Sequence, residues 1–280
     1  MAEQPTRTGL IQRHASAIGW GLGAIVVLGC IALPSRHFAD TLREPELITG
    51  YSLFGLCLLL AALNGRKRLS VLPLIKTSFW KTMHWVAGLV AAAAYWLHVE
   101  TWWPTGLYEQ ALAALFYLVT LTGIVGFTWQ QILPRRLTQS GVEVIFEQIP
   151  NKIVTIREQA EDTVLACTKE LGSDTLARFY VETFQWFFRR PRFILSHARG
   201  GQRAAFWIAQ QLATVRRYLS EKEIAYLEQL QELAEAKARL DLHYAAQGLL
   251  KVWLLVHVPL AAAMLVLAAW HMLLVNVYSL

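Results

Sequence analysis

Charged residues are scarce in this chain, and that scarcity excludes an ordinary soluble globule. Of its 280 residues, 16% are charged and 55% are hydrophobic. A soluble domain typically carries about 25% charged residues to cover its surface. We therefore expect much of this surface to meet membrane lipid. The eleven tryptophans and nine tyrosines suit a protein with two membrane–water interfaces.

Cysteine is also rare, and its spacing excludes several cofactor sites. The three cysteines are Cys30, Cys57 and Cys167, and no Cys-x-x-Cys sequence occurs. The chain therefore gives no sign of a covalently attached c-type haem, an iron–sulfur cluster or a zinc ribbon. We expect isolated cysteines of this kind to be small core residues.

Signatures of common soluble enzymes are missing too. The chain contains no G-x-G-x-x-G, G-x-S-x-G, H-E-x-x-H or P-loop sequence. The net charge of +6 does not require nucleic acid, since 17 of the 26 basic residues lie between Arg135 and Lys251. A basic face beside a membrane also attracts anionic lipid or an acidic protein, so we expect no nucleic-acid partner.

Apolar runs long enough to cross a bilayer are abundant. A helical span needs about 20 mostly apolar residues. The runs lie near residues 15–33, 47–63, 79–103, 108–133 and 248–278. We interpret the first as a retained span and not a signal peptide. The sequence thus predicts an all-α integral membrane helical bundle of about five spans, four in residues 1–133 and the fifth in residues 248–280.

Basic residues predict the orientation of these spans. The loop around Pro104 has no lysine or arginine. The preceding loop, residues 64–81, is rich in them: Arg66, Lys67, Arg68, Lys76 and Lys81. The positive-inside rule then places the N-terminus and this basic loop in the cytoplasm and the C-terminus outside. We expect an integral protein of a bacterial inner membrane.

Residues 134–247 differ in kind from the spans. Helical patterning recurs at residues 143–149, 153–171, 175–188, 204–218 and 221–244. Pro150, Gly172, Pro191 and the Gly200-Gly201 pair separate these segments. We predict a helical cytoplasmic domain inserted between spans four and five, with a last helix that can continue into span five. Its aromatic run, residues 179–188, suits either a helix on the membrane surface or the core of the insert.

The most informative residues are four histidines in the third and fifth apolar runs. His84 and His98 are 14 residues apart, and His257 and His271 have the same separation. Over 14 residues a helix rises about 21 Å and makes almost four whole turns, so each pair lies on one face at two depths. Pairing His84 with His257, and His98 with His271, would give each of two metal centres one ligand from each helix.

Neutral imidazole is a suitable haem ligand, and two imidazoles leave the iron no open position for oxygen. We therefore predict that the two pairs bind two non-covalent b haems for electron transfer. A haem-free scaffold or transporter-like subunit, with the histidines in packing or proton relay, is an alternative. His14, His197 and His243 lie outside the paired pattern, and we expect surface roles for them.

Other residues near the histidines fit a haem site and ordinary helix packing equally well. Gly88, Gly123 and Gly126 either admit a porphyrin or let helices approach closely. Pro259 either kinks the fifth span or is tolerated there. The candidate cations for haem propionates, which snorkelling or loop charges explain equally well, are Lys81, Lys251, Arg36 and His37.

The histidine pairs on the third and fifth spans resemble those of dihaem cytochrome b proteins, especially the transmembrane core of ferric reductases and NADPH oxidases. They are similar too to cytochrome b561-type anchors and the quinone-linked b subunits of respiratory complexes. The resemblance covers about residues 79–133 and 248–278, and implies non-covalent haem b and electron passage across the bilayer. The chain departs from the reductases in lacking a flavin or nicotinamide domain and in carrying the insert.

We therefore predict the membrane subunit of a larger redox complex, which transfers electrons across the membrane and is not an enzyme by itself. The expected partners are membrane lipid and a redox protein, bound at the insert through Arg189, Arg190 and Arg192 or at the outer face. The alternative is a quinol-oxidising or metal-reducing cytochrome b with its own substrate site beside one haem. A quinone is accordingly a further candidate cofactor.

Overall fold

The computed structural model describes residues 7–40, 45–68 and 77–278, and every regular element in that part of the chain is a helix. This confirms the all-α prediction. The chain divides into two compact units. The first unit contains the residues up to Phe127 together with residues 256–280, and the second contains residues 128–255. Each unit is described separately below.

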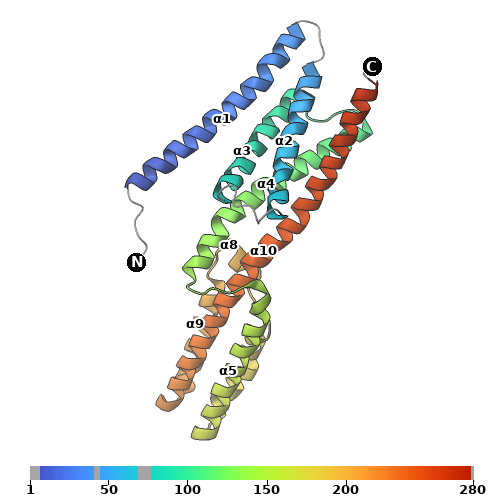
Figure 1. Ribbon diagram of the computed structural model, residues 1–280. Helices are drawn as coiled ribbons and strands as arrows, with labels where there is room; N and C mark the ends of the chain where they lie inside the picture. Colours follow the sequence, from blue (N-terminus) through green and yellow to red (C-terminus); the bar gives the residue numbers. More distant parts are fainter. Residues whose placement is uncertain (1–6, 41–44, 69–76, 279–280) are drawn as a thin grey trace. The chain divides into compact units, whose positions relative to one another are not determined.

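The first unit is built from five long helices (Figure 1). They are α1 (Arg7–Asp40), α2 (Pro45–Arg68), α3 (Thr77–Val99), most of α4 (Leu107–Gln139) and the last part of α10 (Glu221–Tyr278). Helices α1, α2 and α3 contact one another. A buried apolar cluster then joins α2, α3, α4 and α10, and its members are Cys57, Tyr95, Ala113, Phe116 and Met264.

Helix α3 packs closely against its neighbours, and several of its buried residues are small. Ala87, Ala91 and Ala94 are all buried, and their methyl groups let neighbouring helices approach closely. Aromatic contacts hold α3 to α4. Tyr95 stacks on Phe116 with 4.1 Å between ring centroids, and Trp85 stacks on Phe127 at 4.0 Å.

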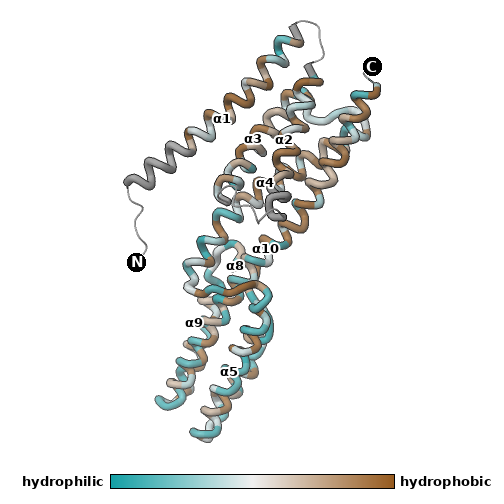
Figure 2. Tube along the Cα trace, viewed as in Figure 1, coloured by the Kyte–Doolittle hydropathy of each residue, from teal (hydrophilic) through white to brown (hydrophobic). Residues whose placement is uncertain are grey.

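The helices of the first unit consist largely of hydrophobic residues, drawn in brown in Figure 2, and many of their large apolar side chains are exposed. Large aliphatic side chains point outward with two thirds or so of their area exposed, such as Ile25 (67%), Leu33 (69%) and Val266 (68%). An apolar surface of this extent would be unfavourable in water. It suits the hydrocarbon of a bilayer, in which helices satisfy their own backbone hydrogen bonds.

Three described helices are long and apolar enough to cross a membrane, namely Ala17–Phe38 of α1, α4 and α10. The apolar stretch of α2, Glu46–Ala62, is shorter. In α3, Lys81, His84 and His98 interrupt the apolar sequence and lower its hydropathy. The second and third predicted spans therefore stay predictions.

The structure corrects the first predicted loop, and part of the second lies outside the described residues. Helix α1 continues through Pro34 to Asp40, so the predicted loop after residue 33 is too long. Proline removes one helical hydrogen bond and is tolerated in apolar helices of this kind. The basic residues Arg66, Lys67, Arg68 and Lys76 lie outside the described side chains.

The second unit is a set of shorter helices (Figure 1). They are η1 (Phe146–Gln148), α5 (Ile149–Leu171), α6 (Thr175–Phe179), η2 (Tyr180–Phe184), α7 (Gln185–Arg189), α8 (Ile194–Arg199), α9 (Arg203–Val215), η3 (Arg216–Tyr218) and the first part of α10. Glycines with positive φ end α5 and α8, Gly172 at 66° and Gly200 at 80°.

The predicted helices of the insert are found with two corrections. The helix expected at residues 143–149 is wrong, since only the single turn η1 forms there. Helix α5 instead begins at Ile149, because Pro150 occupies the first turn, where its missing N–H costs no hydrogen bond. The segment at 175–188 is helical but contains the π-helical turn η2 in its middle.

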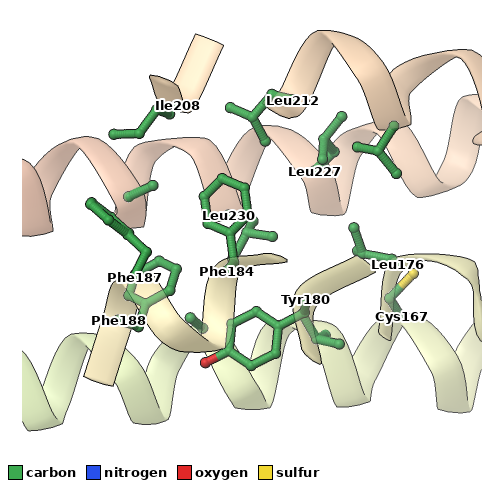
Figure 3. Packing of buried hydrophobic residues seen from close by; sticks show 14 residues of the cluster. Cys167, Leu176, Tyr180, Phe184, Phe187, Phe188, Ile208, Leu212, Leu227 and Leu230 are labelled. Atoms are coloured by element: carbon green, nitrogen blue, oxygen red, sulfur yellow. The ribbon is translucent and has the colours of Figure 1, made fainter. Parts of the chain in front are cut away.

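The aromatic run forms the core of the second unit and not a helix on a membrane surface. Tyr180, Phe184, Phe187 and Phe188 are buried, and the close-up in Figure 3 shows them among apolar side chains of α5, α9 and α10. Trp186 is the exception among the tryptophan and phenylalanine residues of this run, with 46% of its area exposed. A helix on the membrane surface, the first of the two interpretations of this run, is therefore excluded.

Helix α10 is continuous over 58 residues, which confirms that the last helix of the insert runs into the fifth apolar run. It begins with a capping arrangement at Ser220. The Glu223 carboxylate accepts hydrogen bonds from the Ser220 N–H (2.8 Å) and hydroxyl (2.7 Å). The hydrogen bonds from Ser173 and Ser220 lower the pKa of Glu223. The helix also continues through Pro259.

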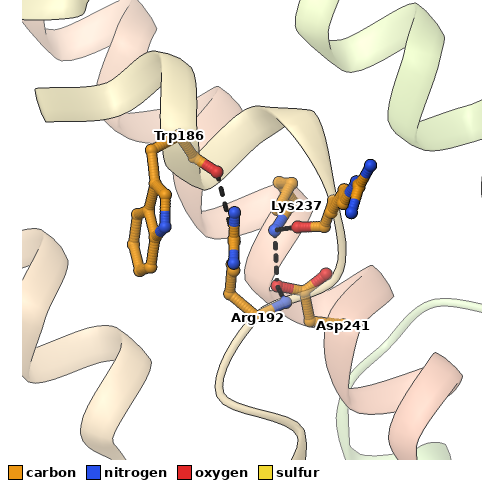
Figure 4. A network of polar contacts seen from close by, with 5 residues as sticks. Trp186, Arg192, Lys237 and Asp241 are labelled. Carbon is orange, nitrogen blue, oxygen red and sulfur yellow. Dashed lines mark hydrogen bonds and ion pairs between the residues drawn. The ribbon is translucent and has the colours of Figure 1, made fainter. Parts of the chain in front are cut away.

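A buried ion pair fastens the loop after α7 to α10 (Figure 4). Lys237 and Asp241, one turn apart and with no exposed side-chain area, are joined by a 2.7 Å contact. The Lys237 ammonium also donates to the Arg190 carbonyl (2.8 Å) and lies 4.1 Å from the Phe187 ring centroid. Asp241 accepts the Arg192 backbone N–H at 3.1 Å. Burial lowers the pKa of Lys237 to about 8 and raises that of Asp241 to about 6.

This pair predicts a strongly asymmetric mutational response. Lys237→Met leaves a buried carboxylate without its cation, and we expect a loss of about 3–5 kcal/mol in unfolding free energy. The double variant Lys237→Met/Asp241→Leu removes both charges and should regain most of that loss. Denaturant unfolding in detergent, followed by circular dichroism, measures both. Lys222→Met, at an exposed position of α10, is the matched control, and a single variant as stable as this control would contradict the account.

The same variant predicts a pH dependence. In Lys237→Met, burial without a cation keeps the pKa of Asp241 above its unfolded-state value of about 4. The folded state then binds the proton more tightly than the unfolded state. Stability relative to the wild type should therefore rise as the pH falls from about 7 to about 5. Melting temperatures at the two pH values test this, and a deficit that does not change with pH would contradict it.

Candidate functional site

The four paired histidines all lie in the first unit, on the two helices that the sequence indicates. His84 and His98 are on α3, and His257 and His271 are on the apolar part of α10. All four side chains are partly buried. The rings of His98 and His271 face each other with 6.5 Å between their centroids and 82° between their planes.

That separation suits two ligands on one metal. Two imidazoles bound on opposite sides of a metal have their centroids about 6 Å apart, because the metal–nitrogen bond is about 2 Å and the nitrogen lies about 1 Å from its ring centroid. The separation of His98 and His271 is close to this value.

The second pair is brought together as well. His84 and His257 are close enough for their charges to interact. The Nδ1 atom of His84 is buried and forms no hydrogen bond with the described residues. Since His84 neighbours His257 and His98 neighbours His271, α3 and the apolar part of α10 run in the same direction. The two histidine pairs therefore occupy two levels along the same pair of helices.

A threonine of α2 contacts one ring of the first pair. The hydroxyl oxygen of Thr49 lies 3.0 Å from Nδ1 of His98. The same hydroxyl donates its hydrogen to the carbonyl of Glu46, at 3.1 Å. A hydroxyl has one hydrogen to donate, so towards His98 the oxygen acts as an acceptor. This arrangement favours a proton on Nδ1 of His98.

A threonine of α4 contacts one ring of the second pair in the same way. The hydroxyl oxygen of Thr122 lies 2.9 Å from Nδ1 of His257. Its own hydrogen is directed to the carbonyls of Leu118 (2.8 Å) and Val119 (3.0 Å). The same arrangement favours a proton on Nδ1 of His257.

His271 is held by aromatic stacking. The ring of Tyr108 lies 6.0 Å from that of His271, with 20° between the two planes. The Tyr108 hydroxyl donates to the carbonyl of Leu267, one helical turn before His271, at 2.5 Å. Near the end of α10, the Tyr51 hydroxyl donates to the side chain of Asn276. These contacts fix α10 against the start of α4 and against α2.

The glycines near the histidines differ in their surroundings. A Cβ atom at Gly50 would lie 3.0 Å from Cε1 of His98, and one at Gly123 would lie 3.6 Å from Cε1 of His257. A Cβ atom at Gly88 would meet nothing within 4 Å among the described residues, which favours open space over close helix packing there. Gly126 is buried.

The candidate propionate cations give a mixed result. Lys251 belongs to the second unit, where it forms an ion pair with Glu147 and lies 4.2 Å from the Phe146 ring centroid. The charge of Lys251 is therefore already paired with that of Glu147. Lys81, Arg36 and His37 are exposed, the last two near the end of α1. No described contact assigns any of these three to a haem.

Two histidines outside the pairs were expected at the surface, and that expectation is wrong. His197 and His243 are buried in the second unit, and burial lowers the pKa of each ring. His243 Nε2 donates to the Ser140 hydroxyl at 2.9 Å, and its Nδ1 faces the Gln247 amide at 3.3 Å. Both nitrogens of His243 are thus used in structure. The side chain of His14 lies outside the described residues.

The arrangement in the first unit can therefore supply pairs of neutral imidazoles and little else. No group of three or more histidine, cysteine, aspartate or glutamate side chains among the described residues could hold a bare metal ion. Two ligands per iron suffice for haem, since the porphyrin supplies the other four. The 6.5 Å separation of the His98 and His271 ring centroids is compatible with that group.

Sequence reasoning missed the two threonines. A single threonine in an apolar helix is common and usually bonds its own backbone, so neither Thr49 nor Thr122 stands out by type. A signal existed in their context, because each is followed at once by a glycine, Gly50 or Gly123. Only the packing of the helices shows that each Thr-Gly pair lies against a histidine ring.

Comparison with known proteins gives no further guide. No family model, no curated protein and no solved structure matches this chain. The function proposed below therefore depends on the residues of the chain and on their geometry.

Proposed function

We propose that this chain is an integral membrane protein that transfers electrons across a bilayer through two bis-histidine b-type haems, as the membrane subunit of a larger redox complex. The proposal depends on one observation. Histidines of α3 lie near histidines of α10 at two levels along these helices. His98 and His271 have the centroid separation expected of two ligands on one metal. We assign His84 and His257 as the second pair, because they lie near enough to each other to interact electrostatically.

The residues of the chain would have distinct tasks in such a protein. Bound haem supplies reversible one-electron chemistry at its iron. The four histidines would hold the two groups through Nε2, each iron taking one ligand from α3 and one from α10. With both axial positions filled by imidazole, oxygen has no open position to bind. The surrounding apolar helices would exclude water from both sites.

The membrane arrangement is part of the proposal. We place five spans in α1, α2, α3, α4 and the apolar end of α10. The N-terminus, the basic loop between α2 and α3, and the second unit would then lie in the cytoplasm, as the positive-inside rule favours. The C-terminus would lie outside. The apolar surface of the first unit and its three clearly span-length helices support this placement.

The second unit offers a cationic surface for a redox partner. From residue 183 to residue 220 the chain contains no aspartate or glutamate. The same stretch contains seven arginines: Arg189, Arg190, Arg192, Arg199, Arg203, Arg216 and Arg217. Arg189 and Arg190 are exposed, whereas the Arg192 guanidinium lies 4.3 Å from the Trp186 ring centroid. Such a surface favours an acidic protein partner.

The pairing of the histidines is tested by single substitutions. His98→Ala and His271→Ala should each lose or alter the same haem, and His84→Ala and His257→Ala should each affect the other one. Reduced-minus-oxidised absorption spectra combined with redox titration of purified variants distinguish the two haems. Removing one of two axial ligands leaves a high-spin or empty site.

His197→Gln is the matched control, because this histidine lies in the second unit and outside the pairs. Its spectrum should equal that of the wild type. The pairing would be contradicted if His98→Ala and His257→Ala affected one haem while His84→Ala and His271→Ala affected the other.

Docking is tested with a small acidic flavoprotein as the electron donor. Arg189→Glu/Arg190→Glu should slow the reduction of the chain at low ionic strength by roughly tenfold or more, since charge steering sets the encounter rate. Stopped-flow absorption at several salt concentrations gives the rates. Lys169→Glu, an exposed charge reversal on α5, should have a smaller effect. Equal rates for the two variants and the wild type would contradict docking at these arginines.

A further inference from the structure

We infer that Thr49-Gly50 and Thr122-Gly123 are two copies of one positioning device, in which the threonine fixes the proton of a ligand histidine on Nδ1 and the glycine lies against its ring. The inference rests on the proposed function, because it assigns these residues to the haem ligands His98 and His257. It adds residues from α2 and α4 to a site whose ligands lie on α3 and α10.

The hydrogen-bond geometry carries the first step. Thr49 is 1% exposed, and its hydroxyl lies between the Glu46 carbonyl and Nδ1 of His98. Thr122 lies between its own helix carbonyls and Nδ1 of His257. Each hydroxyl donates to its own helix and accepts from the ring. Each ring is therefore held as the tautomer that presents Nε2 to a metal.

The adjacent glycines carry the second step. Each glycine faces Cε1 of the ring that its neighbouring threonine holds. At Gly50 a Cβ atom would be 3.0 Å from His98 Cε1, closer than side chains normally approach. At Gly123 the corresponding distance is 3.6 Å, an ordinary contact. The fit is thus tighter at His98 than at His257, and Gly50→Ala should disturb its histidine more than Gly123→Ala does.

The chemical consequence follows from the role of outer hydrogen bonds at metal sites. An acceptor on the Nδ1–H of a ligand histidine orients the ring and makes Nε2 a stronger electron donor. A stronger donor favours ferric over ferrous iron and lowers the midpoint potential. Each predicted haem has one histidine held in this way, His257 at one level and His98 at the other. The two threonines would therefore tune the two haems independently.

The test compares threonine variants that keep or lose the hydroxyl. Thr122→Val should raise the midpoint potential of the haem at His84 and His257 and leave the other unchanged. Thr49→Val should do the same for the haem at His98 and His271. Thr122→Ser and Thr49→Ser keep the hydroxyl and should match the wild type. Spectroelectrochemical titration and the electron paramagnetic resonance of the low-spin ferric state provide the readouts.

Several outcomes decide the inference. Loss of only the adjacent haem in a valine variant, with both haems kept in its serine counterpart, also supports a positioning role. Unchanged potentials and resonance spectra in both valine variants would overturn it. So would loss of both haems from one valine variant, since the threonine would then support the fold and not one ring.

The proposed function fails separately, by the absence of haem from the wild type. The tautomer part of the inference is then still decided by nitrogen NMR of the haem-free protein. His98 and His257 should carry their proton on Nδ1 in the wild type and lose that preference in the matching valine variant. A proton on Nε2 in the wild type would overturn the inference.

Discussion

An imidazole ring in an apolar helix needs a partner for each of its two nitrogens, and this requirement organises the first unit. At His98 and His257 one nitrogen is satisfied by a threonine of a neighbouring helix, at 3.0 Å and 2.9 Å. An unsatisfied polar group costs several kcal/mol in hydrocarbon, roughly 2–7 by transfer measurements. In the proposed function, a haem iron would be the partner of the remaining nitrogen of each ring.

The two units solve the problem of buried polar groups in different ways. In the second unit the ion pair of Lys237 and Asp241 is satisfied locally, by the backbone of Arg190 and Arg192 and by the Phe187 ring. His243 is likewise used between Ser140 and Gln247. In the first unit, histidines of α3 and α10 are instead brought near one another. The proposed chemistry is therefore assigned to the first unit, and the cationic surface of the second unit to partner binding.

Much of this could be predicted from the sequence, because the strongest signals are local. Apolar runs, the equal 14-residue spacings and the helical pattern of the insert indicate helices and identify the four histidines. The errors and omissions come from tertiary packing. The burial of His197 and His243, the aromatic core around Phe184 and the contacts of Thr49 and Thr122 depend on which helices meet. Pro150 was misread for a different reason, since a proline separates helices in one position and begins a helix in another.

The central claim is that the two histidine pairs bind two haems, and one measurement tests it most directly. Pyridine-haemochrome quantitation on the purified full chain, expressed with haem supplied, gives the type and number of haems per polypeptide. The account predicts two b haems per chain. A folded, helical preparation that contains no haem would contradict it, and the histidines would then be packing or proton-relay residues of a membrane protein without haem.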